Sequence, residues 1–432
     1  MAIKQILFII VLLVTLGIFA YSISKIIKNF RLTKKAFPIK NIGKRTMLML
    51  RVAFFQSKIF RNPIAGTIHA LVFWGFLIIV VGSAEMLIDG VFGTERSLAV
   101  LGIVYSFISG LGDIFAYVIG VSVLVFLFRR IFLNIARLHG PELNKKNHQD
   151  ANFALFLIFL LMLTLAVMNI SYIAISDTDI KGIYPVSALL IGLFSFSHET
   201  FHLLYEINWW GHILLIFFFM NILPYSKHFH IFMSIPNVFL SRLDPLGKIP
   251  NMENVTKEVK LMLDPSTAFA KPSLEETNQE IERFGVKDIE DSTWKNYLDS
   301  LTCTQCGRCS SVCPANITGK KLSPRKLFID LRQRMKEKSK GLIKEGKEYN
   351  DNKSFIRDYI SEEEIWACTT CNACAQECPL NINHPTLIID MRRYLVMEEA
   401  AAPAEINTIF TNIENNGAPW QFSPEDRMLW AD

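Results

Sequence analysis

Five long apolar runs in the first half of the chain restrict its fold more than any other feature. They lie near residues 4–26, 66–89, 111–129, 152–175 and 209–231. Each run is close to the roughly 20 helical residues that cross a hydrocarbon core. Backbone polar groups must be hydrogen-bonded internally in lipid, so the runs predict transmembrane helices.

The first apolar run has the features of a retained membrane helix rather than a cleaved signal peptide. Its basic residues follow the run instead of preceding it, and the run is longer than a usual signal core. The moderately apolar stretch 185–207 predicts a helix on the outer surface that leads into the fifth span.

Basic residues in the short loops predict the orientation of the bundle. The loop after the first span contains eleven lysines and arginines between residues 25 and 61, and the third loop contains five between 129 and 146. The second and fourth loops contain only Arg96 and Lys181. We therefore expect loops one and three to be cytoplasmic, with the N-terminus outside and the C-terminal region inside the cell.

All eight cysteines lie between Cys303 and Cys378, in two runs with the same spacing. CTQCGRCSSVCP and CTTCNACAQECP both read C-x2-C-x2-C-x3-C-P, and the second run follows the first by 65 residues. This spacing is typical of two-cluster ferredoxins, in which the fourth cysteine of each run binds the other cluster. Structural zinc needs four ligands in two pairs, which would not explain the third and fourth cysteines or the proline.

The two runs therefore predict two [4Fe–4S] clusters with crossed ligation. Cluster 1 is expected to be held by Cys303, Cys306, Cys309 and Cys378, and cluster 2 by Cys368, Cys371, Cys374 and Cys313. Clustered C-x-x-C motifs also indicate a reducing compartment rather than disulfides.

The segment between the cysteine runs, including SPRKLFIDLRQRMKEKSKGLIKEGKE, has helical composition. The expected fold class is therefore all-α, a five-helix transmembrane bundle followed by an α-helical two-cluster ferredoxin domain. The expected domains are a transmembrane haem b domain at 1–235, a cytoplasmic connector at 236–294, the cluster domain at 295–395 and a C-terminal tail at 396–432.

Histidines in the membrane half are candidate haem ligands, since unpartnered imidazole is costly in lipid and two imidazoles can bind haem b. His69 and His230 are both expected at the cytoplasmic depth, as the pair for an inner haem. His212 precedes His230 by 18 residues, about five turns at roughly 3.6 residues per turn, so one continuous helix would present both on one face. Pro224 lies between them, and a proline at this place would kink the helix and change the direction in which His230 points.

An outer haem would need a second ligand for His212, and the outer loop offers His202, or His198 one turn earlier. The alternative for each of these histidines is a polar side chain at the membrane interface with no iron. His228 points away from the face that carries His230 and fits that alternative.

Two regions resemble known families. IWACTTCNACAQECP followed by IIDMRRYLVME resembles the iron–sulfur subunits of heterodisulfide reductase and of related glycerol-3-phosphate and lactate oxidoreductases. NPIAGTIHALVFWGF and WWGHILLIFFFMNILPYSKHFH resemble the haem b gamma subunit of respiratory nitrate reductase. The fusion is similar to membrane electron-transfer flavoprotein:menaquinone oxidoreductases.

The sequence departs from these families in two places. Nitrate reductase gamma subunits have two histidines on the second span, whereas this chain has His69 and, about ten residues later, Ile79. The longer oxidoreductases continue into a cysteine-rich domain with C-C-G repeats, and the tail GAPWQFSPEDRMLW resembles the lead-in to it. We expect that domain to be a separate subunit.

These features predict an electron-transfer subunit of a quinone oxidoreductase in the bacterial cytoplasmic membrane. Electrons would pass from a cytoplasmic donor such as electron-transfer flavoprotein through the clusters and one or two haems b to quinone. No residue is expected to act as a nucleophile or general base, because the cofactors carry the chemistry. The alternatives are a non-enzymatic redox sensor or scaffold, and electron flow from quinol to a disulfide. A net charge of +5 does not indicate nucleic acid as a partner.

Overall fold

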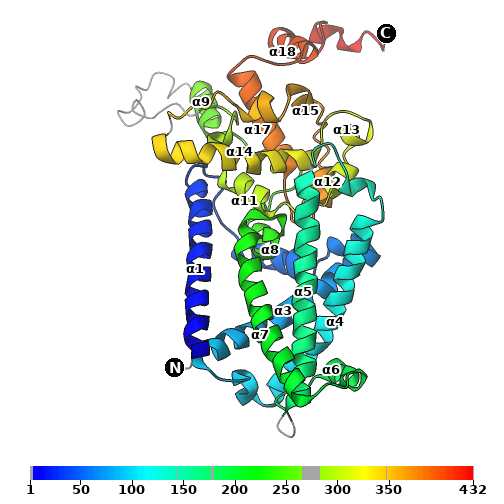
Figure 1. Cartoon of the computed structure of the whole chain (residues 1–432). Coiled ribbons are helices and arrows are strands. Elements are labelled where there is room, and N and C mark those ends of the chain that lie inside the picture. Colours follow the sequence, from blue (N-terminus) through cyan, green and yellow to red (C-terminus); the bar gives the residue numbers. More distant parts are fainter. Residues whose placement is uncertain (1–2, 144, 177–179, 265–282, 347, 432) are drawn as a thin grey trace.

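The structure is a computed structural model that describes residues 3–143, 145–176, 180–264, 283–346 and 348–431. A bundle of long helices carries a second, water-facing group of helices at one end (Figure 1). The N-terminus lies at the opposite end of the bundle (Figure 1). Among the described residues the elements are helices and two isolated β-bridges, which confirms the expected all-α fold class.

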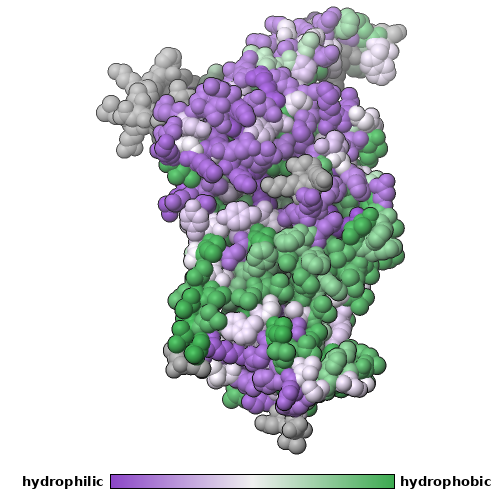
Figure 2. Space-filling model, viewed as in Figure 1, coloured by the Kyte–Doolittle hydropathy of each residue, from purple (hydrophilic) through white to green (hydrophobic). Residues whose placement is uncertain are grey.

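Five helices are long and apolar enough to cross a membrane. Figure 2 shows their side chains as an apolar band between two polar ends of the molecule. The spans lie on α1 (Ile3–Phe30), α3 (Pro63–Phe92), α4 (Ile103–Ile131), α5 (Lys145–Ile175) and α7 (His198–Ile222). The chain is therefore a multi-pass membrane protein, with spans several residues longer than the apolar runs that predicted them.

The ends of α3 are fixed by local sequence. Pro63 stands in the first turn, where its missing N–H costs nothing, and the Asn62 side chain accepts a hydrogen bond from the backbone of Ala65. The helix stops at Gly93, whose φ of +70° suits glycine. Gly66, in the first turn of the same helix, must be glycine for lack of space, since a Cβ there would lie 2.5 Å from the carbonyl oxygen of Ile59.

The fifth span differs from the expected helix over 209–231. It begins at His198, capped by Ser197, and ends at Ile222 because Pro224 cannot continue the hydrogen-bonding pattern. Two short 3-10 turns, Leu223–Tyr225 and Lys227–Phe229, lead into α8 (His230–Phe239). His212 and His230 therefore lie on different helices, and the argument that placed them on one helix face was wrong.

The end of the bundle opposite the water-facing helices is closed by α6 (Pro185–Leu190), which is tied to α4 through Asp113. The Asp113 carboxylate accepts hydrogen bonds from the backbone N–H groups of Val186 (2.8 Å) and Ser187 (3.0 Å) and from the Ser187 hydroxyl (2.5 Å). Asn169 on α5 donates to the same carboxylate (3.2 Å). Asp113 thus fixes three elements at this end of the bundle.

Aromatic rings fill part of the bundle between α1, α3 and α7. The buried ring of Phe8 lies 5.8 Å from the ring of Trp209 and 6.0 Å from that of Phe217. Gly90 on α3 leaves room for Phe8, since a Cβ at Gly90 would lie 2.5 Å from that ring. This close packing leaves α1 held to the bundle by apolar contact along its length.

The water-facing part is built from shorter helices, and its buried core is continuous with that of the adjoining end of the bundle. Its helices are α9 (Glu253–Leu263), α11 (Trp294–Thr302), α12 (Arg308–Ser311), α13 (Pro314–Ile317), α14 (Pro324–Glu345), α15 (Glu362–Trp366), α16 (Ala373–Glu377), α17 (His384–Met397) and α18 (Ala404–Asn416). Phe328, Leu331 and Met335 of α14 are fully buried in this core. A further helix, α2 (Ile42–Met49), and a π-helical turn (Leu50–Phe54) lie in the first loop of the bundle.

The bundle and the water-facing helices share a polar junction at α8. Asn237 donates to Asp299 (3.1 Å) and to the carbonyl of Leu380 (3.0 Å), and it accepts from Lys295 (2.9 Å). Since Asn237 is fully buried, these contacts satisfy a side chain that would otherwise be costly. The expected boundary at residue 235 falls inside α8, which therefore belongs to the junction.

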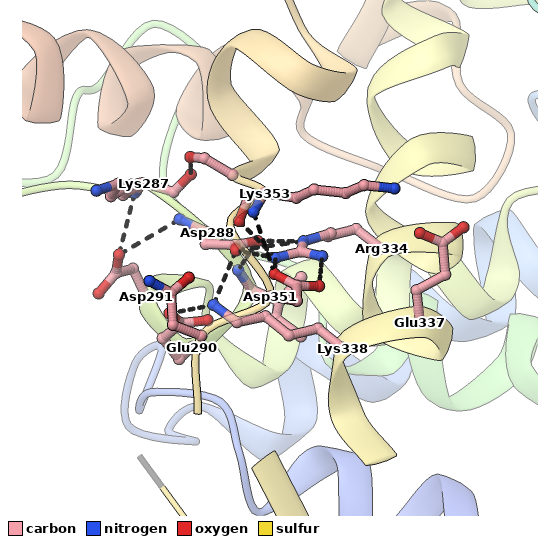
Figure 3. Close-up of polar contacts among 12 residues, drawn as sticks. Lys287, Asp288, Glu290, Asp291, Arg334, Glu337, Lys338, Asp351 and Lys353 are labelled. Atoms are coloured by element: carbon pink, nitrogen blue, oxygen red, sulfur yellow. Dashed lines mark hydrogen bonds and ion pairs between the residues drawn. The ribbon is translucent and has the colours of Figure 1, made fainter. Parts of the chain in front are cut away.

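A buried ion-pair network holds the segment before α11 against α14 (Figure 3). Arg334 is fully buried and contacts Asp288 (2.6 Å) and Asp351 (2.5 Å). Lys338, one turn later on α14, contacts Asp288 (2.9 Å) and Glu290 (2.7 Å). The network fixes the chain that approaches the first cysteine run.

Replacing Arg334 with methionine should destabilise the water-facing helices by about 3–5 kcal/mol, because it leaves the Asp288 carboxylate buried with one cation fewer. Urea unfolding of the full chain in detergent measures this effect as a lower midpoint for loss of the iron–sulfur absorbance. The matched control is Lys321→Met, which breaks the exposed Lys321–Glu363 pair (70% and 59% exposed) and should leave the midpoint close to that of the unaltered protein. Equal midpoints for the two variants would contradict the role given to the network.

Candidate metal centres

The two cysteine runs adopt the same local backbone. In the first run, Gln305 and Gly307 have φ of +57° and +75°, and the matching residues of the second run, Thr370 and Asn372, have φ of +54° and +62°. The backbone N–H of Thr370 lies 3.4 Å from the sulfur of Cys368. Left-handed turns of this kind point backbone N–H groups at the sulfurs, and hydrogen bonds to the sulfurs help set the potential of a cluster.

The structure brings the cysteines together in the crossed arrangement expected from their spacing. Cys303, Cys306, Cys309 and Cys378 line one cavity. The thiol of Cys378 interacts electrostatically with those of Cys306 and Cys303, across more than 70 residues of chain. In the second group the thiols of Cys368 and Cys374 interact with that of Cys313. The fourth cysteine of each run thus lies with the first three of the other.

Burial sets the protonation of these thiols in the absence of iron. It raises the pKa of Cys303 to about 11, and those of Cys374 and Cys378 to about 12, with neighbouring thiols adding to the effect. Iron binds the thiolate, so loading each cluster must displace protons and compensate four closely placed negative charges.

The donor set fits iron–sulfur cubanes better than single ions. Each centre gathers four cysteines, three from one run and the fourth from the other, which is the donor set that two-cluster ferredoxins use. His384 also lines the cluster 1 cavity, and its buried Nδ1 has no hydrogen-bond partner among the described residues.

The cluster 1 loops lie directly on the ends of the membrane helices. Lys58, from the first loop, donates to the carbonyl of Cys378 (3.1 Å), and Arg137, from the third, donates to that of Cys306 (3.2 Å). Lys227, after α7, donates to the side chain of Gln305 (3.2 Å). Gly307 must be glycine here, because a Cβ would lie 2.1 Å from the carbonyl oxygen of Arg137.

Cluster 2 lies closer to water. Cys371 is exposed and Cys368 is half-buried, whereas Cys303, Cys309 and Cys378 are buried. Arg392 on α17 donates to the carbonyl of Cys368 (2.6 Å) and stacks over the ring of Trp366. The two centres therefore form a sequence from the water-facing surface to the membrane helices.

The expected inner haem ligands lie at the same end of the bundle as cluster 1. His69 Nδ1 is 3.0 Å from Oε1 of Gln56, and His230 Nδ1 is 3.1 Å from the carbonyl oxygen of Lys227. Both contacts use Nδ1, so each ring keeps Nε2 available for iron.

The expected outer pair is not brought together. His202 and His212 both lie on α7, ten residues and about 15 Å apart at roughly 1.5 Å per residue. His202 and His198 are exposed, whereas His212 is buried and contacts Thr164 on α5 (2.9 Å). Two residues of one helix at this separation cannot both bind one iron. Ile79, at the position where nitrate reductase gamma subunits have their second histidine, packs against the core.

Gln56, Lys58, Arg137 and Lys227 are site residues that the sequence did not single out. Lys58 and Arg137 were used only as loop charges that indicate the membrane orientation. Lys227 and Gln56 were not used in any prediction. A lysine that binds a carbonyl of a cluster loop has no sequence pattern different from one that faces lipid headgroups. The contacts depend on how the two parts of the chain dock, which no local spacing reveals.

Comparisons with known proteins support this arrangement. Residues 302–382 match the family model described as 4Fe-4S dicluster domain. The chain is 28% identical to a probable iron-sulfur-binding oxidoreductase FadF of Bacillus subtilis, over 99% of this chain and 61% of that protein. It is 29% identical to the EtfAB:quinone oxidoreductase of Syntrophomonas wolfei, over 98% of this chain and 59% of that protein. A probable membrane-anchored ferredoxin of Chromohalobacter salexigens is 36% identical over 34% of this chain and 24% of its own length.

These matches define a membrane iron–sulfur protein with a 4Fe-4S dicluster domain. The chain is similar to the EtfAB:quinone oxidoreductase along nearly its whole length, and several heterodisulfide reductase C subunits match its cluster region, so the expected resemblance to these two groups is confirmed. The chain spans about 60% of the length of the first two relatives. No solved structure matches it.

Serine substitutions test the crossed ligation. Cys378→Ser and Cys306→Ser should remove the same EPR signal, and Cys313→Ser and Cys371→Ser should remove the other, because each pair shares a cubane. Iron should fall from about eight to about four per chain in each variant. If Cys378→Ser removed the same signal as Cys371→Ser, ligation would follow the runs instead of crossing them.

Proposed function

We propose that this chain carries electrons from a soluble cytoplasmic donor to membrane quinone through two [4Fe–4S] clusters and one inner haem b. The observation that carries the proposal is the sequence of sites from water to membrane. Cys371 is exposed, the cluster 1 loops contact the membrane helices, and Arg308 of the cluster 1 loop donates to the carbonyl of Lys58, two residues after the Gln56 that contacts His69. Each step joins elements that lie next to each other.

The cluster 1 loop and the membrane helices are connected on both sides of the proposed haem site. Arg308 donates to the carbonyls of Lys58 (2.9 Å) and Ile59 (3.4 Å), two and three residues after Gln56, which holds His69. On the other side, Lys227 contacts Gln305 through its side chain and His230 through its carbonyl. A change in the position of the cluster domain would therefore act on both histidines.

His69 and His230 would hold the haem, and Gln56 and the Lys227 carbonyl would fix the tautomer and ring orientation of each ligand. When bound, the haem supplies one-electron chemistry between the clusters and quinone. His212, which contacts Thr164 on α5 and lies ten residues from His202 on the same helix, is not part of this proposal.

The orientation supports a cytoplasmic donor. The basic loops one and three lie at the same end as the cluster domain, and this distribution of lysine and arginine favours the cytoplasmic side of a bacterial inner membrane for that domain. Part of this charge also binds the cluster domain, as Lys58 and Arg137 show.

The described part of the tail offers a surface for a partner, and we propose the cysteine-rich C-C-G subunit as its occupant. Helix α18 has no buried residue, and the region 404–431 exposes large apolar side chains far from the membrane. These are Ile409, Phe410, Ile413, Trp420, Phe422, Met428, Leu429 and Trp430. Apolar exposure on this scale at a water-facing end is typical of a protein–protein interface.

Alanine at His69 or His230 should abolish haem b binding while leaving about eight irons in clusters, because each residue would supply one of the two imidazoles that hold the haem. Pyridine haemochrome spectra and iron analysis of purified protein measure both. The matched control is His202→Ala, which should keep haem at the wild-type level. Gln56→Leu should weaken haem binding by about 10–100-fold. Full haem content in both axial variants would refute the assignment.

Quinone reduction by detergent-solubilised protein, with reduced methyl viologen as donor and a short-chain menaquinone or ubiquinone analogue as acceptor, tests the function. The rate should exceed the protein-free rate and should fall to it in His69→Ala. Loaded wild-type protein that gave only the protein-free rate with both acceptors would favour the sensor or scaffold reading.

A further inference from the structure

Cations from three membrane loops surround cluster 1. Lys58, Arg137 and Lys227 follow or precede different spans, all three are half-buried, and each donates to a different point of the cluster 1 loops. Each also interacts electrostatically with a different thiol of the cluster, namely Cys378, Cys306 and Cys303. Three cations therefore lie beside cluster 1 on the side that faces the membrane helices.

Carboxylates offset only part of this charge. Arg325, which also reaches the cluster 1 loop, is paired with Glu142 (2.6 Å), and Arg61 is paired with Glu377 (2.8 Å). Asp150 accepts the backbone N–H of Lys227 (3.1 Å) and also faces Arg130. Glu377 also faces Lys58 and Arg137, so this one carboxylate is shared by three cations, and with Arg308 the charge beside cluster 1 stays positive.

Cluster 2 has a different environment. Arg392 approaches it from α17 within the water-facing part and donates to the carbonyls of Ile365 (2.8 Å) and Cys368 (2.6 Å). Nearby Lys321 is paired with Glu363 on the surface. Cys371 is exposed, so water screens charges around this cluster more than around cluster 1.

We propose that docking on the membrane loops raises the reduction potential of cluster 1 above that of cluster 2, so that electrons move from the water-facing cluster toward the membrane. The proposal rests on the cluster assignments of the proposed function and adds a direction and its cause. One electron leaves cluster 2, which is oxidised, and enters cluster 1, which is reduced. No bond forms or breaks and no proton is required.

The physical reason is the charge added on reduction. A reduced cluster carries one more negative charge, and cations a few ångströms away in a poorly screened region stabilise it. Burial acts in the opposite sense, because an added electron is less well solvated in cluster 1 than in cluster 2. The membrane-loop cations must outweigh that penalty, which makes them determinants of direction as well as of docking.

EPR-monitored redox titration of the full-length protein in detergent tests the proposal. Lys58→Met, Arg137→Met and Lys227→Met should each lower the potential of the same signal, that of cluster 1, and leave the other in place. We expect about a tenfold loss in the equilibrium constant for reduction, which is about 59 mV for a one-electron couple. The serine variants of the cysteines assign the two signals.

Three controls separate charge from structure. Arg392→Met should lower the potential of cluster 2 instead, Lys321→Met should change neither, and Lys58→Arg and Arg137→Lys should keep the wild-type potentials. The proposal is overturned if cluster 1 titrates below cluster 2 in the wild-type protein, or if the loop variants shift both signals equally or neither. Absence of haem or of quinone reduction would defeat the proposed function but leave this comparison of potentials intact.

Discussion

The hydrogen bonds between basic residues of the membrane loops and the backbone of the cluster loops are the interaction on which the rest of the structure depends. Lys58, Arg137 and Lys227 reach carbonyl or amide oxygens of residues 305, 306 and 378. Together with the Asn237 junction at α8, they hold the dicluster domain against the bundle. With them, cluster 1 has a fixed position beside the helix ends that carry His69 and His230.

The same docking uses polar side chains from both parts of the chain. Arg308 and Arg325 return contacts from the cluster domain to the loops, where they bind the carbonyls of Lys58 and Arg137. Asn237 and Lys295 extend the junction beneath α11. These groups are largely satisfied by backbone carbonyls, which have fixed positions, and so the junction is specific as well as stable.

Much of this architecture could be predicted from the sequence because two strong patterns determine it. Apolar length and the lipid environment leave helices as the only choice for the five spans, and a 65-residue repeat of C-x2-C-x2-C-x3-C-P leaves few alternatives to two clusters. The crossed grouping of Cys378 with Cys303, and of Cys313 with Cys368, follows a geometric rule of the fold.

The parts that the sequence did not predict depend on tertiary structure. Periodicity placed His212 and His230 on one helix, whereas Pro224 ends that helix and His230 starts the next. His202 was the available partner for His212 by elimination, but it lies ten residues away on the same helix and faces outward. The positioning roles of Gln56 and Lys227 required knowledge of which segments dock.

Rapid mixing of the oxidised full-length protein with reduced methyl viologen, followed at the cluster absorbance and at the haem b α-band, tests the central claim most directly. The account predicts that the clusters bleach first and that the haem band then rises, and that Cys378→Ser, which lacks cluster 1, greatly slows haem reduction. Haem reduction at the wild-type rate in Cys378→Ser would show that electrons bypass the clusters, and would contradict the account.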